Sequence, residues 1–232
     1  MSAGIEAVLF DWGGTLSTHG DGDLLAMWHA AAEVLAPDDP EPLAKALLAA
    51  EDAWWRERVS EGDGTGSGTT EEIVRSVAAQ THLPVEEALA AYHGAWERTV
   101  DHDPAAVAVL AGCRERGWRT GLLSNTHWPR ALHDRWLDEA GLLALLDARV
   151  YTSDLGHMKP HPLAFHALLE ALDVRPEVAV FVGDRPRDDI SGAHAAGMRA
   201  VLLTDRPVES FDVEPDASLP QLAGLLELLD RW

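Results

Sequence analysis

Short apolar runs alternate with longer Ala- and Leu-rich segments along most of the chain. The first run, residues 5–10, ends abruptly at Asp11 and a pair of glycines, which is typical of a buried parallel strand that leads into a loop. Similar runs predict further strands at residues 118–123, 149–152, 178–182 and 199–203. The segments expected as helices between and after them are residues 105–116, 129–140, 162–172, 188–196 and 219–229. This alternation predicts an α/β fold with a parallel sheet that is covered on both faces.

A block of helices separates the first expected strand from the next. Its segments are rich in Ala, Leu and Glu and are interrupted by few β-branched runs, and they cover residues 24–36, 40–60, 70–80 and 84–100. We therefore expect an inserted all-helical cap domain at residues 17–100, within a core formed by residues 1–16 and 101–232.

The stretch EGDGTGSG at residues 61–68 predicts a mobile, glycine-rich link between two helices of the insert. It lacks the Gly-Lys-Ser/Thr ending of a P-loop, which argues against a phosphate cradle at this place.

Charge narrows the range of partners. The formal net charge is -21 over 232 residues, and such a surface repels both nucleic acid and anionic membranes. A small phosphorylated substrate is compatible with this charge because a local cation can reverse the field inside a pocket.

The sequence starts without a signal-peptide pattern and has no apolar run near the roughly 20 residues of a membrane span, so the expected location is the cytoplasm. No sequence feature indicates an oligomeric state, and Cys113, the only cysteine, leaves no intrachain disulfide.

Polar residues of a particular kind follow four of the expected strands. In chain order they are Asp11, Ser124 with Asn125, Lys159, and Asp184 with Asp188 and Asp189. Functional residues of open α/β sheets gather at the carboxyl ends of the strands. Carboxylate oxygens are good ligands for Mg²⁺, a carboxylate can attack phosphorus, and a lysine can offset the charge of a phosphoryl group. The pattern indicates Mg²⁺-assisted phosphoryl chemistry.

The order and spacing of these residues resemble the haloacid dehalogenase-like hydrolase superfamily, in the branch with a helical cap after the first strand. The stretch VFVGDRPRDDISGAHAAGM, residues 180–198, is especially similar to that family. The resemblance implies a Rossmann-like three-layer core and a Mg²⁺-dependent phosphatase that acts on a small phosphorylated metabolite through an aspartyl-phosphate.

The resemblance also implies roles for individual residues. Asp11 is the expected nucleophile, with Ser124 and Lys159 as its catalytic partners. The phosphate is expected to contact Thr15, Asn125 and Gly14. The expected Mg²⁺ ligands are Asp11, the backbone carbonyl of Gly13, Asp184, and Asp189 or Asp188.

Gly13 departs from the family pattern, because phosphatases of this family carry an aspartate there as general acid and base. Such a group contributes about 10² to 10⁴ in rate, so fast turnover is in question. One alternative is a catalytically weak phosphate-binding or regulatory protein. Another is a carbon–phosphorus hydrolase that resembles phosphonoacetaldehyde hydrolases and uses Lys45, the only lysine of the cap, to form a Schiff base with the substrate. His19, in the loop after the first motif, could also replace the missing acid.

Aromatic and basic residues cluster on one expected cap helix: Trp54, Trp55, Arg56 and Arg58. Together they suit an anionic or aromatic substrate. The interpretation that we favour is packing of one Trp inside the cap and pairing of the arginines with nearby acids, with one of these residues reaching the site. Arg185 and Arg187, which flank the acidic motif, are expected to face solvent rather than to pair with these carboxylates.

Overall fold

The main sheet of the computed structural model has six strands in the order β5-β4-β1-β6-β7-β8, and every neighbouring pair is parallel. The structure describes residues 4–18, 23–78, 84–97, 99–207 and 212–232. The strands are β1 (Ala7–Phe10), β4 (Arg119–Ser124), β5 (Ala148–Tyr151), β6 (Ala179–Gly183), β7 (Arg199–Leu203) and β8 (Ala217–Leu219). This arrangement confirms the α/β class.

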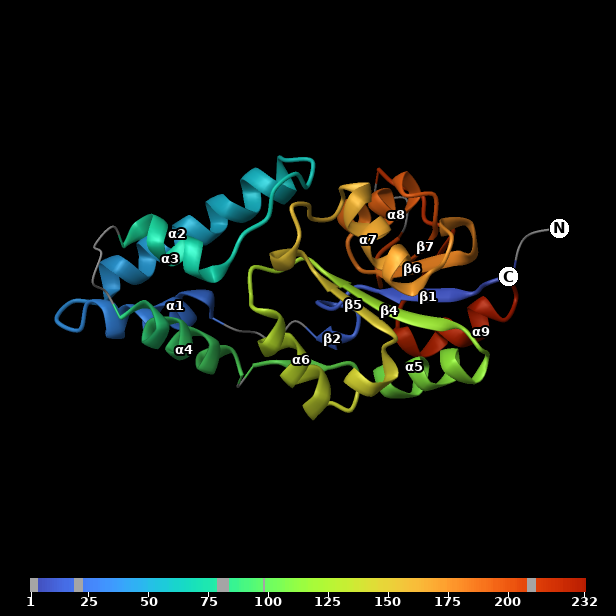
Figure 1. Cartoon of the computed structure of the whole chain (residues 1–232), viewed down its shortest axis with the longest axis horizontal. Helices are drawn as coiled ribbons and strands as arrows, with labels where there is room; N and C mark the ends of the chain where they lie inside the picture. Colours follow the sequence, from blue (N-terminus) through green and yellow to red (C-terminus); the bar gives the residue numbers. More distant parts are fainter. Residues whose placement is uncertain (1–3, 19–22, 79–83, 98, 208–211) are drawn as a thin grey trace.

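Helices cover both faces of the sheet (Figure 1). Successive strand residues point to opposite faces, so Val8 and Phe10 of β1 pack on one side and Ala7 and Leu9 on the other. The first face is covered by α5 (Ala106–Glu115), α6 (Arg130–Glu139) and α9 (Leu225–Leu229), and the second by α7 (Pro162–Leu172) and α8 (Gly192–Ala195). The result is the three-layer, Rossmann-like core that we expected.

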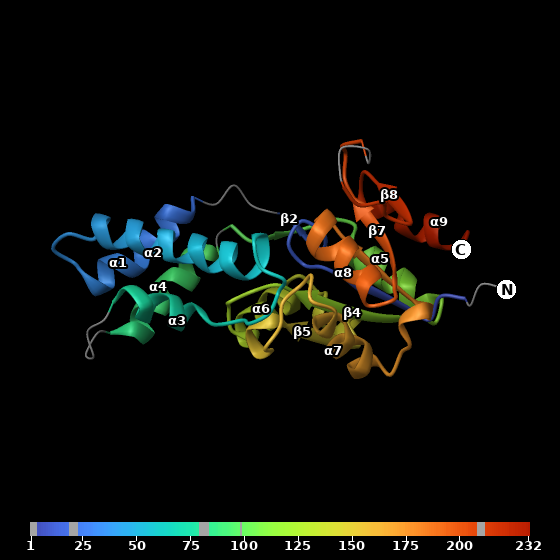
Figure 2. The ribbon, with the colours of Figure 1, turned by 90° about the horizontal axis from the view of Figure 1, so that it is seen from above.

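Four further helices form a separate helical unit beyond one end of the sheet (Figures 1 and 2). They are α1 (Leu24–Leu35), α2 (Glu41–Trp55), α3 (Thr70–Val77) and α4 (Val85–Trp96). The unit has its own buried core, in which the rings of Trp28 and Tyr92 stack with their centroids 4.1 Å apart. Side-chain caps start two of these helices: Asp23 caps α1, and Thr69 forms a capping box with Glu72 at α3.

Short strands differ most from expectation. An antiparallel pair of two-residue strands, β2 (Ser17–Thr18) and β3 (Asp101–His102), joins the two chain segments that lead into and out of the helical unit. At the other end of the chain, β8 adds an edge strand where we expected a helix to begin at residue 219. Strands of two or three residues are too short to show a period in the sequence, so pattern reasoning does not find them.

The glycine-rich stretch at residues 61–68 is bound to the core, whereas the sequence pattern favoured a mobile link. The amide of Gly66 donates to the carbonyl of Gly156 over 2.8 Å, and the amide of Met158 donates to the carbonyl of Gly64 over 2.6 Å. Gly64 has a φ of +81°, and a Cβ there would lie 2.9 Å from the amide nitrogen of His161. Only glycine lets the backbones approach this closely.

Two smaller features of the described residues complete the fold. Cys113 is completely buried, and burial raises the pKa of its thiol to about 12. Within the described ranges, no helix has the length and apolar character needed to cross a membrane.

Candidate functional site

Asp11 and Lys159 form a buried ion pair at the carboxyl end of the central strand. The backbone amide of Asp11 donates to the carbonyl of Val182 over 2.9 Å, which places Asp11 between the ends of β1 and β6. The Nζ of Lys159 lies 2.5 Å from the Oδ1 of Asp11 and 2.7 Å from the Oδ1 of Asp189. Burial alone lowers the pKa of Lys159, but the charges of Asp11 and Asp189 outweigh it and raise that pKa. The ammonium group is therefore charged and fixed between two carboxylates.

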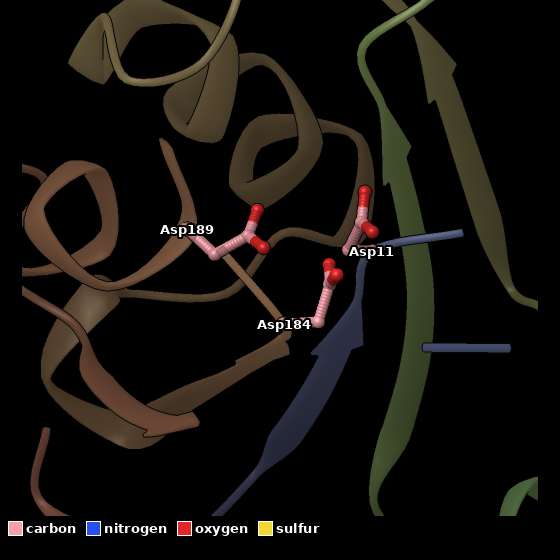
Figure 3. Close-up of side chains that lie close together, drawn as sticks. All are labelled: Asp11, Asp184 and Asp189. Carbon is pink, nitrogen blue, oxygen red and sulfur yellow. The ribbon is translucent and has the colours of Figure 1, made fainter. Parts of the chain in front are cut away.

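Three carboxylates converge at this point, and we call Asp11, Asp184 and Asp189 the aspartate cluster. One oxygen from each lies within 4.8 Å of the others, and Figure 3 shows the Asp184 side chain, at the end of β6, extending toward Asp11. Burial, followed by the charges of Asp11 and Asp189, raises the pKa of Asp184 well above its usual range. Burial also raises the pKa of Asp189.

The charge of the aspartate cluster fits a hard cation. When all three carboxylates are ionised, they and Lys159 leave a net negative charge in a site that is largely closed to water, and an uncompensated buried charge is costly. Oxygen ligands of this type and number suit Mg²⁺. Of the two aspartates between which the sequence could not choose, Asp189 joins the cluster and Asp188 does not.

Two glycines allow the carboxylates to approach. Gly14 has a φ of +83°, and a Cβ there would lie 2.6 Å from the Cγ of Asp184. At Gly183, a Cβ would lie 2.5 Å from the Cβ of Asp189. Both distances are far below ordinary van der Waals contact, so a larger residue at either position would displace a carboxylate.

Asn125 holds the loop that carries Lys159. Its Nδ2 donates to the carbonyl of Lys159 and its Oδ1 accepts from the amide of Lys159, both over 2.8 Å. The amide group is thus engaged with the lysine backbone, although Asn125 also lines the cavity described below. Ser124 is buried beside it, and the Oγ1 of Thr15 is buried without a hydrogen-bond partner among the described residues.

A cavity of about 370 Å³ leads from Asp11 and Lys159 to the helical unit. Four tryptophans contribute to its walls, and we call them the aromatic wall: Trp12, Trp55, Trp96 and Trp128. Trp55 and Trp96 come from the ends of α2 and α4, whereas Trp12 and Trp128 follow β1 and β4. The rings of Trp96 and Trp128 meet across this boundary with centroids 4.9 Å apart. Pattern reasoning missed Trp96 and Trp128, because no local signal relates residues so far apart.

A buried hydrogen-bond network also joins the helical unit to the core. The Oε1 of Glu51 on α2 lies 2.8 Å from the Nε2 of His127, and the Nδ1 of His127 lies 2.9 Å from the Oγ1 of Thr70. The indole of Trp28 donates to the other oxygen of Glu51. Burial raises the pKa of Glu51, but the hydrogen bonds and the charge of His127 outweigh it and lower that pKa. Since His127 is three residues after Ser124, this network fixes the loop beside the site. It too was missed from the sequence.

The four residues that we singled out on the insert lie in different environments. Trp55 lines the cavity, and Trp54 is buried in the core of the helical unit. Arg58 lies over the ring of Trp54 at 4.9 Å, and Arg56 is 3.9 Å from Glu61. Neither arginine is part of the cavity wall as the described residues define it.

Lys45 is exposed on α2, and its Nζ lies 2.9 Å from the Oε1 of Glu41. It does not belong to the described lining of the cavity, so its position gives no support to a Schiff-base reaction. His19 lies outside the described residues.

Both arginines of the acidic motif are exposed, as expected, but each also makes a contact. The Nη1 of Arg185 lies 3.5 Å from the Oδ2 of Asp188, and both residues line the cavity. Arg187 donates to backbone carbonyls of the segment after α2, including that of Ser60 over 3.0 Å. Arg187 therefore joins the core to the helical unit.

Comparisons with known proteins agree with this geometry. Residues 5–197 match the family model for haloacid dehalogenase-like hydrolases. A glyceraldehyde 3-phosphate phosphatase from Pyrococcus furiosus is 32% identical over 152 residues, which cover 61% of this chain and 60% of that protein. Two solved structures, each 24% identical, share the fold: a phosphatase from Thermococcus onnurineus (TM-score 0.69, 97% of this chain and 98% of that chain) and the L-2-haloacid dehalogenase RSc1362 (TM-score 0.66, 98% and 100%).

The chain spans only part of its curated relatives. The matched regions cover 50%, 60% and 45% of three such proteins. Similarity in sequence therefore shows the family, and the activity has to be argued from the site.

Proposed function

Because the chain belongs to the haloacid dehalogenase-like hydrolase family, we propose that it is a Mg²⁺-dependent phosphatase that acts on a small phosphorylated molecule. The observation that carries this proposal is the aspartate cluster, whose carboxylate oxygens lie within 4.8 Å of one another beside Lys159. The similarity to a glyceraldehyde 3-phosphate phosphatase supports phosphorus rather than a carbon–halogen bond as the target.

In this proposal Asp11 attacks the phosphorus of the substrate. A bond forms between an Asp11 carboxylate oxygen and phosphorus, and the bond from phosphorus to the ester oxygen breaks; the leaving oxygen departs as an anion and takes up a proton from water, which gives the free alcohol. Water then attacks the phosphorus, releases inorganic phosphate and restores Asp11. Covalent catalysis of this kind divides one difficult displacement into two easier ones.

The remaining residues position the phosphoryl group and its charge. Lys159 holds Asp11 and stabilises negative charge on the phosphoryl oxygens, while the hydroxyls of Thr15 and Ser124 and the backbone at Gly14 bind those oxygens. Asn125 acts mainly by fixing the backbone of Lys159.

The residues that would hold Mg²⁺ are the aspartate cluster and the backbone carbonyl of Gly13. A bound Mg²⁺ would offset charge that develops on the phosphoryl oxygens. Burial and the charges of Asp11 and Asp189 raise the pKa of Asp184, and a nearby cation would act in the opposite direction by favouring its ionised form.

We further propose that residues 17–100 act as a cap over a core of residues 1–16 and 101–232. Contacts of the cap with the core at Gly64, Arg187 and His127 would keep bulk water from the aspartyl-phosphate. The leaving alcohol would occupy the part of the cavity between cap and core.

The test is the release of inorganic phosphate from a panel of phosphate monoesters, with and without Mg²⁺, by wild type and Asp11→Asn. We expect release that needs Mg²⁺ and is lost in the variant. Acid quenching followed by mass spectrometry should find a phosphoryl group on Asp11. If the esters and Mg²⁺ bind without any turnover, the weak phosphate-binding alternative that Gly13 suggests replaces the phosphatase.

A further inference from the structure

The structure points to an aryl phosphate monoester as the substrate: we infer that the cavity selects a leaving group that is aromatic and either neutral or cationic, and rejects one that carries a carboxylate. This inference rests on the proposed function, since it assumes that the phosphoryl group binds beside Asp11. Three features of the cavity carry it.

The first feature is the aromatic wall. Its tryptophans reach the cavity from four separate segments of the chain, two in the core and two in the helical unit. Indole rings bind a flat ring by stacking or edge contact, and about 370 Å³ is enough for one ring and a phosphate.

The second feature is the charge of the lining. The basic side chains on the described lining, apart from histidines, are Lys159 and Arg185, and both contact aspartates at the phosphate end. His127 is bound to Glu51, and burial lowers the pKa of His133 to about 3, so His133 is neutral near pH 7.

A carboxylate that is not paired with His127 also lines the cavity on the side of the helical unit. Asp52 of α2 is exposed there, whereas the neighbouring Glu51 is paired with His127. A substrate carboxylate would therefore meet the like charge of Asp52 without an unpaired cation on the described lining, whereas an ammonium group would be attracted.

The third feature is Gly13, which has no side chain to give a proton to the leaving oxygen. An aliphatic alkoxide needs such a proton, but a phenolate, with the pKa of about 10 that tyrosine shows, leaves far more readily without one. The missing acid and the aromatic wall thus favour the same kind of ester.

The experiment compares phosphate monoesters that differ in one property at a time. Phenyl phosphate, tyramine O-phosphate and 4-hydroxyphenylacetate O-phosphate have phenols of similar acidity but carry no extra charge, an ammonium and a carboxylate. We expect kcat/KM for the carboxylate ester to be at least about tenfold below that of the other two. Benzyl phosphate, which keeps the ring but has an aliphatic leaving oxygen, should be lower than phenyl phosphate by at least about a hundredfold.

Two variants and one control test the lining of the cavity. Trp55→Leu should lower kcat/KM for phenyl phosphate by about tenfold, while Trp118→Leu, which removes an indole outside the described lining, should change no ester by more than about twofold. Asp52→Lys, at an exposed position of α2, should reverse the order of the charged esters. An unchanged order in Asp52→Lys, or equal use of the carboxylate ester by wild type, would overturn the inference while leaving the phosphatase intact.

A binding measurement separates this inference from the proposed reaction. Benzylphosphonate and its 4-aminomethyl and 4-carboxy derivatives cannot be hydrolysed, and quenching of tryptophan fluorescence in the presence of Mg²⁺ reports their binding to wild type. If no ester is turned over but the carboxy compound still binds at least about tenfold more weakly, hydrolysis is refuted and the cavity preference stands. If the carboxy compound binds as well as the others, the preference is refuted.

Discussion

Replacing Gly14 by alanine should separate the stability of the fold from its ability to bind a cation. Two effects act at this position: a φ of +83°, which an L-residue rarely adopts, and a Cβ that would lie 2.6 Å from the Cγ of Asp184. Gly117 provides a matched control, because its φ is +76° and a Cβ there would have nothing within 4 Å. The two variants share the backbone strain and differ in the clash.

The magnitudes follow from this comparison. Left-handed backbone costs an alanine about 1–2 kcal/mol, so both variants should lose about that much free energy of unfolding without Mg²⁺. The Gly14→Ala clash is relieved when Asp184 turns away, which removes one carboxylate from the aspartate cluster. Disturbing the orientation of a metal ligand weakens affinity about 10- to 100-fold.

Urea unfolding with and without Mg²⁺ measures both effects. At a Mg²⁺ concentration of about 100 times the wild-type Kd, wild type and Gly117→Ala should each gain about 2.7 kcal/mol, by mass action. With affinity weakened about 100-fold, Gly14→Ala should gain only about 0.4 kcal/mol. Equal stabilisation of all three proteins by Mg²⁺ would refute the reasoning that Gly14 makes room for Asp184.

Three other outcomes are expected. Burial lowers the pKa of His133 to about 3, so as pH falls below about 6.5 only the unfolded chain gains this proton. About 2 kcal/mol of unfolding free energy is therefore lost between pH 7 and 5. In urea titrations His133→Gln should lose less stability over this pH range, and an unchanged pH dependence would contradict this. Lys159→Met should lower kcat at least about a hundredfold, while Lys45→Met should leave phosphate release as in wild type; a large effect of Lys45→Met would instead favour the Schiff-base alternative. Glu51→Ala leaves His127 without its buried carboxylate partner and should lower the free energy of unfolding by about 3–5 kcal/mol. A loss below about 1 kcal/mol would show that this network does not stabilise the contact between the helical unit and the core.

The local sequence pattern was sufficient to predict the buried strands of the core. β1 and β6 are buried on both faces and read as continuous apolar runs, and the elements that they predict are present in the structure. The aspartate cluster was also predictable, because parallel strands place their carboxyl ends at one edge of the sheet. Thus Asp11 and Asp184, far apart in sequence, follow neighbouring strands.

Contacts between the helical unit and the core could not be predicted in the same way. The pairing of Glu51 with His127 depends on how α2 lies against the loop after β4, and neither residue carries a local signal for it. Gly64 shows the same limit: composition indicated flexibility, whereas the structure uses the missing side chain for close backbone contact with Met158.

The central claim is that aspartates from the two ends of the chain hold one Mg²⁺ beside the nucleophile. Isothermal titration calorimetry of wild type and Asp184→Asn with Mg²⁺ tests it most directly, with the half-exposed Asp216→Asn as control. We predict one ion per wild-type chain, unchanged binding in the control, and affinity at least about tenfold weaker in Asp184→Asn. Equal Mg²⁺ affinity in wild type and Asp184→Asn, or no binding to wild type, would contradict the account.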